Sequence, residues 1–260
     1  MAELFLPQVG AVFSADIAVP EREREVRFYS RVLTTGENPL WREDLMNNAG
    51  WPIIGLGART PEYADLPLQW MPHIQVADVA ASAQRASDLG GRVLVHSRDD
   101  DGRSQWAVLS DPNGAAFGVV PVVAEDAVLK RDDSDAPVGR IAWLDLTVPD
   151  AAATRDFYRE VIGWTTQDVA MEDGGEQYAD YAMVGSEGAG CAGVCSARGQ
   201  NARLPPVWMI YLPVNDLEES LRRVPDEGGT VVKTYPGEDG KPMYAAVRDP
   251  VGAHFGLLAG

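Results

Sequence analysis

Hydrophobic and polar residues follow regular periods along most of the chain, and these periods predict short strands and amphipathic helices. Val12 to Val19 alternates in the manner of a half-buried strand, and Glu21 to Leu33 places its apolar residues on one helical face. We predict further helices over 79–89, 151–162 and 217–225. Further strands are predicted within 41–56, at 71–76, 92–95, 105–109, 115–120, 141–148 and 207–214, and in the last residues to Leu258.

The order of these elements occurs twice. The stretch Asp16–Pro20 with Phe28-Tyr29 returns as Asp145–Pro149 with Phe157-Tyr158, and Asp111-Pro-Asn-Gly returns as Asp249-Pro-Val-Gly. A repeat unit this long is typical of a complete domain rather than of a solenoid. We therefore predict two tandem domains, residues 1–121 and 139–260. The polar, aperiodic residues 122–138 are predicted to form a linker between them.

Composition narrows the classes of partner. The formal charge of −17 argues against binding to nucleic acid or to an anionic membrane surface. No apolar run is long enough to span a bilayer, and the first residues lack the basic start of a signal peptide, so a cytoplasmic location is expected. Cys191 and Cys195 are expected to be free thiols, because no further Cys or His lies near them in the sequence.

The repeated motifs, taken together and in order, resemble those of a known family. Each half has a first strand ending in Val-Pro, a Phe-Tyr pair on the helix, a second strand ending before Asp78 or Asp216, a Gly-Gly pair and a closing Asp-Pro-x-Gly. This combination is similar to the vicinal oxygen chelate superfamily, which includes glyoxalase I, bleomycin-resistance proteins and extradiol dioxygenases. It covers nearly the whole chain and looks most like the tandem glyoxalase-like proteins of actinobacteria.

The resemblance implies an α+β fold of four βαβββ units in two tandem domains. Their curved mixed sheets would form concave cups, with the helices outside. It also implies where metal ligands would stand in the metal-dependent members. In this chain those positions hold Ser14, Met71, Gly118, Trp143, Met209 and Gly256. None of these supplies imidazole nitrogen or carboxylate oxygen, so we predict a site without a metal or another cofactor.

Alternation along the strands predicts which side chains face the cups. The inward set comprises Ser14, Asp16, Met71, His73, Gln75, Trp143, Asp145, Thr147, Met209, Tyr211 and His254. Trp106 and Tyr244 occupy equivalent positions and are candidates for the same walls, although the pattern does not fix their direction. His96 lies beside a charged loop and is expected to be a solvated bystander.

Two interpretations of the polar inward residues stay open. His73 and His254, with Asp16 and Asp145, could act as general acids and bases near neutral pH. Alternatively, the histidines only donate hydrogen bonds to these carboxylates and shape a pocket. The pairing of units is open as well. Ser14 and Asp16 share a cup either with His73 or with Tyr211 and His254.

Three functions fit these features. The first is a metal-independent protein that binds a mid-sized, partly aromatic small molecule, because Met and aromatic walls suit such a ligand. The second is a metal-free cyclase, isomerase or lyase of specialised metabolism. The third and weakest is a metal-dependent glyoxalase or dioxygenase with unexpected ligands. In each case the partner is a small molecule, and the chain is a monomer or a homodimer.

Overall fold

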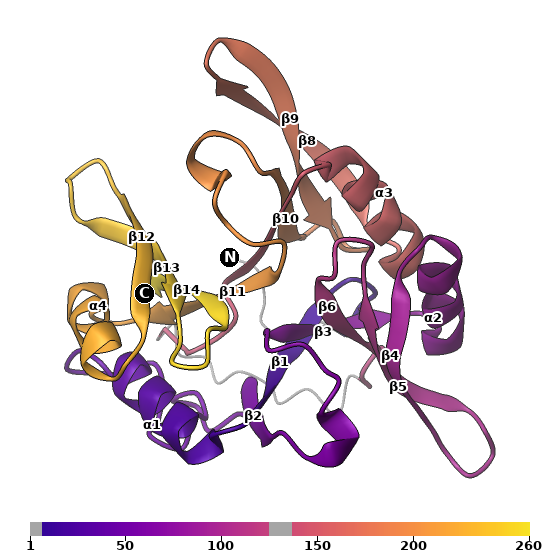
Figure 1. Cartoon of the computed structure of the whole chain (residues 1–260), viewed down its shortest axis with the longest axis horizontal. Helices are drawn as coiled ribbons and strands as arrows, with labels where there is room; N and C mark the ends of the chain where they lie inside the picture. The colour runs from indigo at the N-terminus through magenta and orange to yellow at the C-terminus, as the bar shows by residue number, and fades with distance from the viewer. Residues whose placement is uncertain (1–6, 125–136) are drawn as a thin grey trace. The chain divides into compact units, whose positions relative to one another are not determined.

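Strands and helices alternate along the chain as the sequence predicts. The computed structural model describes residues 7–124 and 137–260 (Figure 1). Six strands share one mixed sheet: β1 (Val12–Val19), β2 (Ile54–Ala58), β3 (Met71–Val76), β4 (Arg92–Arg98), β5 (Ser104–Ser110) and β6 (Ala116–Pro121). Eight share the other: β7 (Trp143–Val148), β8 (Thr165–Asp173), β9 (Glu176–Val184), β10 (Gly190–Ser196), β11 (Trp208–Val214), β12 (Thr230–Pro236), β13 (Pro242–Arg248) and β14 (His254–Ala259). The helices are α1 (Arg22–Leu33), α2 (Val79–Asp88), α3 (Ala151–Ile162) and α4 (Leu217–Asp226). The predicted α+β class is confirmed.

One strand order recurs in three of the four βαβββ repeats, which we call modules and number along the chain by their first strands, β1, β3, β7 and β11. It is β3-β6-β5-β4 in the second module, β7-β10-β9-β8 in the third and β11-β14-β13-β12 in the fourth. In each of them the first strand pairs in parallel with the last strand, and the remaining pairs are antiparallel. A helix connects the first strand to the second, as the βαβββ pattern requires.

The first module differs from the prediction of three strands after its helix. Only β2, paired in parallel with β1, forms a regular strand there, and Trp41 and Asn47 make an isolated bridge. Their side chains bond to backbone elsewhere in the chain. The Trp41 indole donates to the carbonyl oxygen of Pro213 at 2.8 Å, and the Asn47 amide donates to that of Gly139 at 2.9 Å. These side-chain bonds, together with backbone bonds such as that from the Asn48 N–H to the carbonyl oxygen of Leu40, hold the segment without a regular strand ladder.

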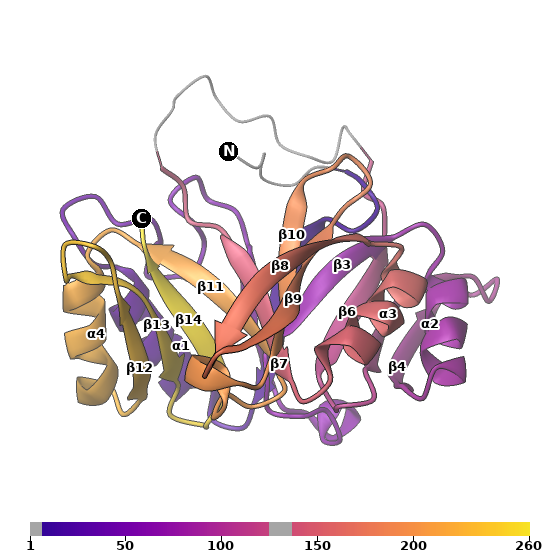
Figure 2. The same ribbon diagram turned by 90° about the horizontal axis from the view of Figure 1, so that it is seen from above.

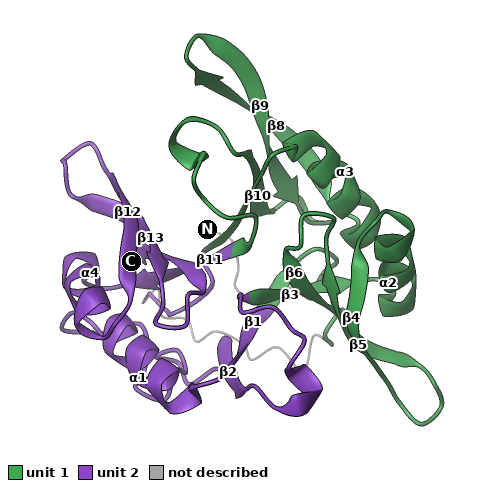
Figure 3. Cartoon of the chain, viewed as in Figure 1, with its two compact units in different colours: residues 1–13, 71–130, 143–208 green, residues 14–70, 131–142, 209–260 purple. Residues whose placement is uncertain are grey.

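The chain divides into two compact units, and each unit combines one module from the first half with one from the second (Figure 3). Unit 1 contains the described parts of residues 1–13, 71–130 and 143–208, and unit 2 those of 14–70, 131–142 and 209–260. The second and third modules therefore share unit 1, and the first and fourth share unit 2. Residues 125–136 of the predicted linker lie outside the described part of the chain, so the domain bounds stay predictions.

Helix ends follow ordinary capping chemistry. Asp78, Asp150 and Asp216 cap α2, α3 and α4, each accepting a hydrogen bond from the backbone N–H three residues later. Helices α2 and α3 lie side by side in unit 1 (Figures 1 and 2), where the Ser82 hydroxyl donates to the carbonyl oxygen of Val161 at 2.7 Å. Helices α1 and α4 lie side by side in unit 2 in the same way.

The repeated sequence motifs meet in the two cores, one copy of each motif from each half. In unit 1, Phe157 packs edge to face on Phe117 at 6.4 Å, and Trp208 donates to the Tyr158 hydroxyl at 2.9 Å. Burial and then the charge of Asp111 raise the pKa of Tyr158. The equivalent set in unit 2 is Phe28, Phe255, Tyr29, Trp70 and Asp249. Each Phe-Tyr pair thus packs on the Asp-Pro-x-Gly segment of the other half.

Candidate functional site

Strands β11 to β14 gather aromatic and basic side chains on one face of the sheet in unit 2. Gly256 pairs with both Tyr211 and Ala246, Ala246 pairs with Lys233, and Tyr244 pairs with Tyr235. Paired residues share a face, and side chains alternate along each strand. The same face therefore carries Tyr211, Lys233, Tyr235, Tyr244 and His254, a set that we call the tyrosine face.

The three rings of the tyrosine face contact one another in a row. Tyr235 and Tyr244 are stacked, with centroids 4.3 Å apart and planes inclined by 15°. Tyr211 meets Tyr244 edge to face at 5.9 Å. The Lys233 ammonium lies 4.5 Å from the Tyr235 centroid. Tyr235, Tyr244 and Lys233 are half-buried, so the row presents both aromatic surface and a positive charge to solvent.

His254 supplies the titratable group of this face. It is half-buried and pairs across the strands with Arg248. Burial lowers the pKa of the His254 imidazole below its usual value, and the charge of Arg248 lowers this pKa further. The imidazole is therefore neutral at pH 7 and able to accept a proton.

In unit 1 the second module turns His73 and Trp106 to one face. His73 pairs with Gly118 on β6, and Gly118 pairs with Val108 on β5, two residues after Trp106. Trp106 is half-buried there, and Tyr244 occupies the equivalent place in unit 2. The structure thus fixes the direction of both side chains, which the sequence left open.

The third module brings a tryptophan and two carboxylates near a thiol. The Trp143 indole donates to the Asp145 carboxylate at 2.8 Å. Burial, then the charges of Asp145 and Asp180, raise the pKa of the Cys195 thiol. Cys191 is free as well, and burial also raises its pKa. Both thiols are therefore protonated at neutral pH and poor nucleophiles.

Several predicted wall residues are buried within the sheets. Met71, Met209 and Thr147 expose at most 5% of their surface, and Gln75 exposes none. The Gln75 side-chain oxygen accepts a hydrogen bond from the backbone N–H of Val123 at 3.0 Å, which ties down the chain after β6. In this structure these four side chains support the sheets and offer little surface to a ligand.

The four predicted acid and base residues are divided between the units. His73 and Asp145 belong to unit 1, and Asp16 and His254 belong to unit 2. The acid and base roles stay predictions, and Ser14 accompanies Asp16 on β1.

Sequence reasoning missed Lys233 and Tyr235 on the tyrosine face. The signal was present in β12, where half-buried and exposed residues alternate from Thr230 to Pro236. Tyr244 had been identified on the neighbouring strand, and a hairpin register joining the two strands would have found both residues. Asp180, which lies near Cys195, was missed because β9 had not been assigned as a separate strand.

Comparison with known proteins agrees with the repeated fold. Residues 140–257 match the family described as the Glyoxalase/Bleomycin resistance protein/Dioxygenase superfamily, and residues 13–120 match one described as the Glyoxalase-like domain. The chain belongs to this superfamily. The resemblance of the sequence to the vicinal oxygen chelate proteins is thereby confirmed.

Relatives within the superfamily are distant. The anthracycline biosynthesis protein DnrV of Streptomyces peucetius is 26% identical over 74% of this chain, which spans 66% of DnrV, slightly less than two thirds. CFP32 of Mycobacterium tuberculosis, named as a candidate glyoxylase, is 30% identical over 74% of this chain and 70% of its own length. A mutant of 4-hydroxymandelate synthase from Streptomyces coelicolor shares the fold with a TM-score of 0.55 at 12% identity, over 97% of this chain and 93% of that one.

The residues at the expected ligand positions do not suit the metal site of the metal-dependent superfamily members. At Gly118 and Gly256, where the resemblance would place a glutamate ligand, the rings of His73 and Tyr211 fill the space that a Cβ would need. Within the described residues, no group of three or more His, Cys, Asp or Glu side chains is arranged to hold a metal ion.

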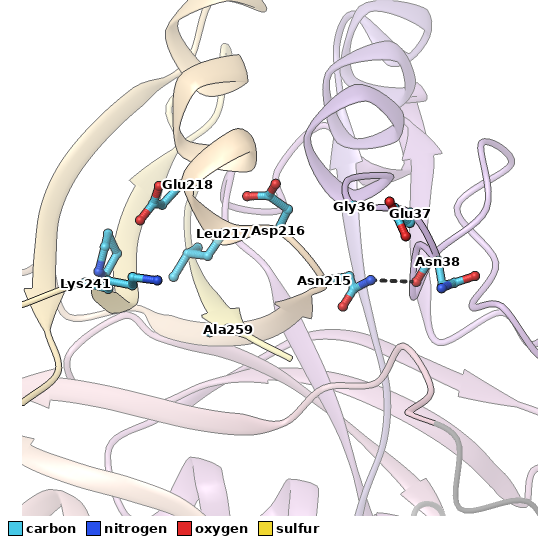
Figure 4. A pocket seen from close by; sticks show the side chains of 10 residues that line it. Gly36, Glu37, Asn38, Asn215, Asp216, Leu217, Glu218, Lys241 and Ala259 are labelled. Atoms are coloured by element: carbon cyan, nitrogen blue, oxygen red, sulfur yellow. Dashed lines mark hydrogen bonds between the residues drawn. The ribbon is translucent and has the colours of Figure 1, made fainter. Parts of the chain in front are cut away.

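A polar pocket of about 500 Å³ lies elsewhere in unit 2, at the N-terminal end of α4 (Figure 4). Asn215 donates to the carbonyl oxygen of Asn38 at 3.2 Å, and Asp216, Glu218 and Lys241 also line it. Asp216 is already engaged as the cap of α4. None of the predicted site residues lines this pocket.

In the described part of the chain, no helix is long and apolar enough to cross a membrane.

Proposed function

We propose that this superfamily member binds a planar aromatic small molecule on the tyrosine face of unit 2. The row formed by Tyr235, Tyr244 and Tyr211 carries the proposal. Stacked and edge-to-face ring pairs contribute about 0.5–1.5 kcal/mol beyond the burial of their area. A flat ligand that extends the row gains this contribution without ordering the tyrosines anew, because they already contact one another.

Charge refines the ligand class. Lys233 lies at the Tyr235 end of the row, and its ammonium favours an anionic or acidic substituent on the ligand. The name of DnrV places that protein in anthracycline biosynthesis. By extension we place this chain in specialised metabolism, as a protein that binds such a compound. A cytoplasmic location and a monomeric or homodimeric state remain predictions.

Calorimetric titration with anthraquinone-2-sulfonate, a planar aromatic anion, tests the proposal. Tyr244→Ala removes the central ring, and we expect it to weaken binding by about tenfold or more, equivalent to roughly 1.4 kcal/mol. Tyr63→Ala removes a half-buried tyrosine from the short helix Pro61–Tyr63 and should leave the affinity unchanged. If the wild-type chain does not bind the probe, or if both variants lose affinity equally, the proposal is wrong.

The charge is tested with a pair of lysine variants. Lys233→Gln should weaken binding of anthraquinone-2-sulfonate by about fivefold and leave binding of neutral 2-(hydroxymethyl)anthraquinone nearly unchanged, because only the sulfonate has a Coulombic interaction to lose. Lys241→Gln, on the exposed turn before β13, is the matched control and should alter neither affinity. Equal losses for both ligands with Lys233→Gln would contradict the role of its charge.

A second candidate, a metal-free cyclase, isomerase or lyase, is favoured by one observation. The neutral, half-buried imidazole of His254 suits a general base at pH 7. Candidate substrates incubated with wild type and with His254→Gln and His73→Gln variants, followed by mass spectrometry, distinguish the two functions. Conversion that a variant abolishes supports catalysis by that histidine. Conversion that both variants retain contradicts the assignment, and a ligand bound without conversion supports binding alone.

A further inference from the structure

One register position recurs in all four modules and holds a glycine each time. The first strand of each module pairs a polar or aromatic residue with a glycine on its parallel neighbour. The four pairs are Asp16 with Gly55, His73 with Gly118, Asp145 with Gly193 and Tyr211 with Gly256. We call these glycines the seat glycines. In this chain glycine therefore recurs at the same register position in all four modules.

Space rather than backbone conformation explains the seat glycines. None of them is among the glycines with positive φ, so an L-residue could adopt their backbone. A Cβ at any of the four, however, would lie within 3.0 Å of the side chain on the paired strand. At Gly256, for example, three ring carbons of Tyr211 lie within 2.7 Å of that position. The paired side chain therefore lies across the neighbouring strand, directly over the glycine.

The side chains that lie over the four seat glycines differ from one another. They are the carboxylates of Asp16 and Asp145, the imidazole of His73 and the phenol of Tyr211. The carboxylates and the imidazole are half-buried. Gly57, two residues beyond Gly55 on the same strand, provides a contrast. A Cβ there would meet only the carbonyl oxygen of Ile17, at 3.8 Å. A Cβ at a seat glycine would thus force the paired side chain to move, and the rings of His73 and Tyr211 can yield less than the terminal carboxylate oxygens of Asp16 and Asp145.

We propose that the seat glycines are positioning residues, each setting the direction of one polar or aromatic side chain per module, and that Gly256 sets the Tyr211 ring within the tyrosine face. The functional consequence rests on the proposed ligand site. An alanine at Gly256 would push the Tyr211 ring away from β14 and so from its edge-to-face contact with Tyr244. A shift of this kind misaligns the ring row without removing any of its rings.

The test is a double-mutant cycle on Gly256 and Tyr211, read by the affinity for anthraquinone-2-sulfonate. We expect Gly256→Ala and Tyr211→Ala each to weaken binding by about tenfold, and the double variant to bind no worse than Tyr211→Ala alone. Gly57→Ala is the matched control and should bind as wild type. If Gly256→Ala behaves like Gly57→Ala, or if the two losses simply add, the proposal is overturned.

A second measurement separates this inference from the proposed function. In protein labelled with 3-fluorotyrosine, the ¹⁹F resonance of Tyr211 reports its ring without any ligand. Gly256→Ala should shift this resonance, and Gly57→Ala should not. If Gly256→Ala fails to fold, the double variant restores the fold, because removing the ring vacates the seat. If the probe does not bind the wild-type chain, only the proposed ligand site is contradicted. If Gly256→Ala leaves the Tyr211 resonance unshifted, the positioning role of Gly256 is contradicted.

Discussion

The phenol of Tyr29 donates a 2.9 Å hydrogen bond to the carboxylate of Asp249, which lies 220 residues later in the chain. The same phenol accepts a hydrogen bond from the Trp70 indole at 2.8 Å. Both Tyr29 and Asp249 belong to motifs that occur twice in the sequence. In unit 2, side chains of the repeated motifs therefore link the first half of the chain to the second by buried hydrogen bonds.

We predict that Tyr29→Phe lowers the free energy of unfolding by about 1–3 kcal/mol, because it leaves two buried polar groups without their partner. Urea denaturation followed by tryptophan fluorescence measures the change. Tyr63→Phe, at the short helix Pro61–Tyr63, is the control and should lie within about 0.5 kcal/mol of wild type. A Tyr29→Phe variant as stable as the control would contradict the role given to this phenol.

Glu25 gives unit 2 a pH dependence. Its side chain is fully buried on α1, and neither carboxylate oxygen has a hydrogen-bond partner. Burial, and then the charge of Asp249, raise the pKa of Glu25 to about 8, against an ordinary value of 4.5, while Arg24 opposes the rise. Between these values the folded chain keeps a proton that the unfolded chain releases. Stability therefore falls as the pH rises through this window.

Replacing the carboxyl by a neutral amide removes this dependence. Glu25→Gln should flatten the decline in unfolding free energy between pH 5 and pH 8, leaving the variant more stable than wild type at pH 8 by roughly 1–3 kcal/mol. Thermal or urea unfolding across this pH range measures it. Glu23→Gln changes an exposed carboxylate on the same helix and should keep the wild-type slope. A Glu25→Gln slope equal to wild type would refute the buried proton.

The charge of Arg248 is predicted to affect the pKa of His254, which can be measured. Arg248 lowers it in addition to burial, so Arg248→Gln should raise the His254 pKa while leaving it below the usual 6.5. NMR titration resolves the change, since the chain has three histidines. His96, whose pKa is lowered by burial and Arg98, is the internal control and should not move. An unchanged His254 pKa would show that Arg248 does not act on it.

Much of the fold could be read from local patterns. The helix over 151–162 and the strands Val12–Val19 and Met71–Val76 coincide with the structure, because hydrophobic period and turn residues are local properties. The prediction of several short strands within 41–56 was wrong except for β2, which begins at Ile54. There the side chains of Trp41 and Asn47 donate hydrogen bonds to carbonyl groups distant in sequence, which no local pattern reveals.

The sequence by itself determined that one module recurs, which face of each first strand is polar, and that the expected metal-ligand positions carry no ligand. Only the tertiary structure decided which copies pack together and which side chains meet. The physical reason lies in the repeat. Both halves carry the same Phe-Tyr and Asp-Pro-x-Gly segments, so either copy could satisfy the hydrogen bond of Tyr29 as far as local chemistry goes. The tertiary fold brings Asp249, directly after β13, to Tyr29 on α1, and strand register places Tyr235 against Tyr244.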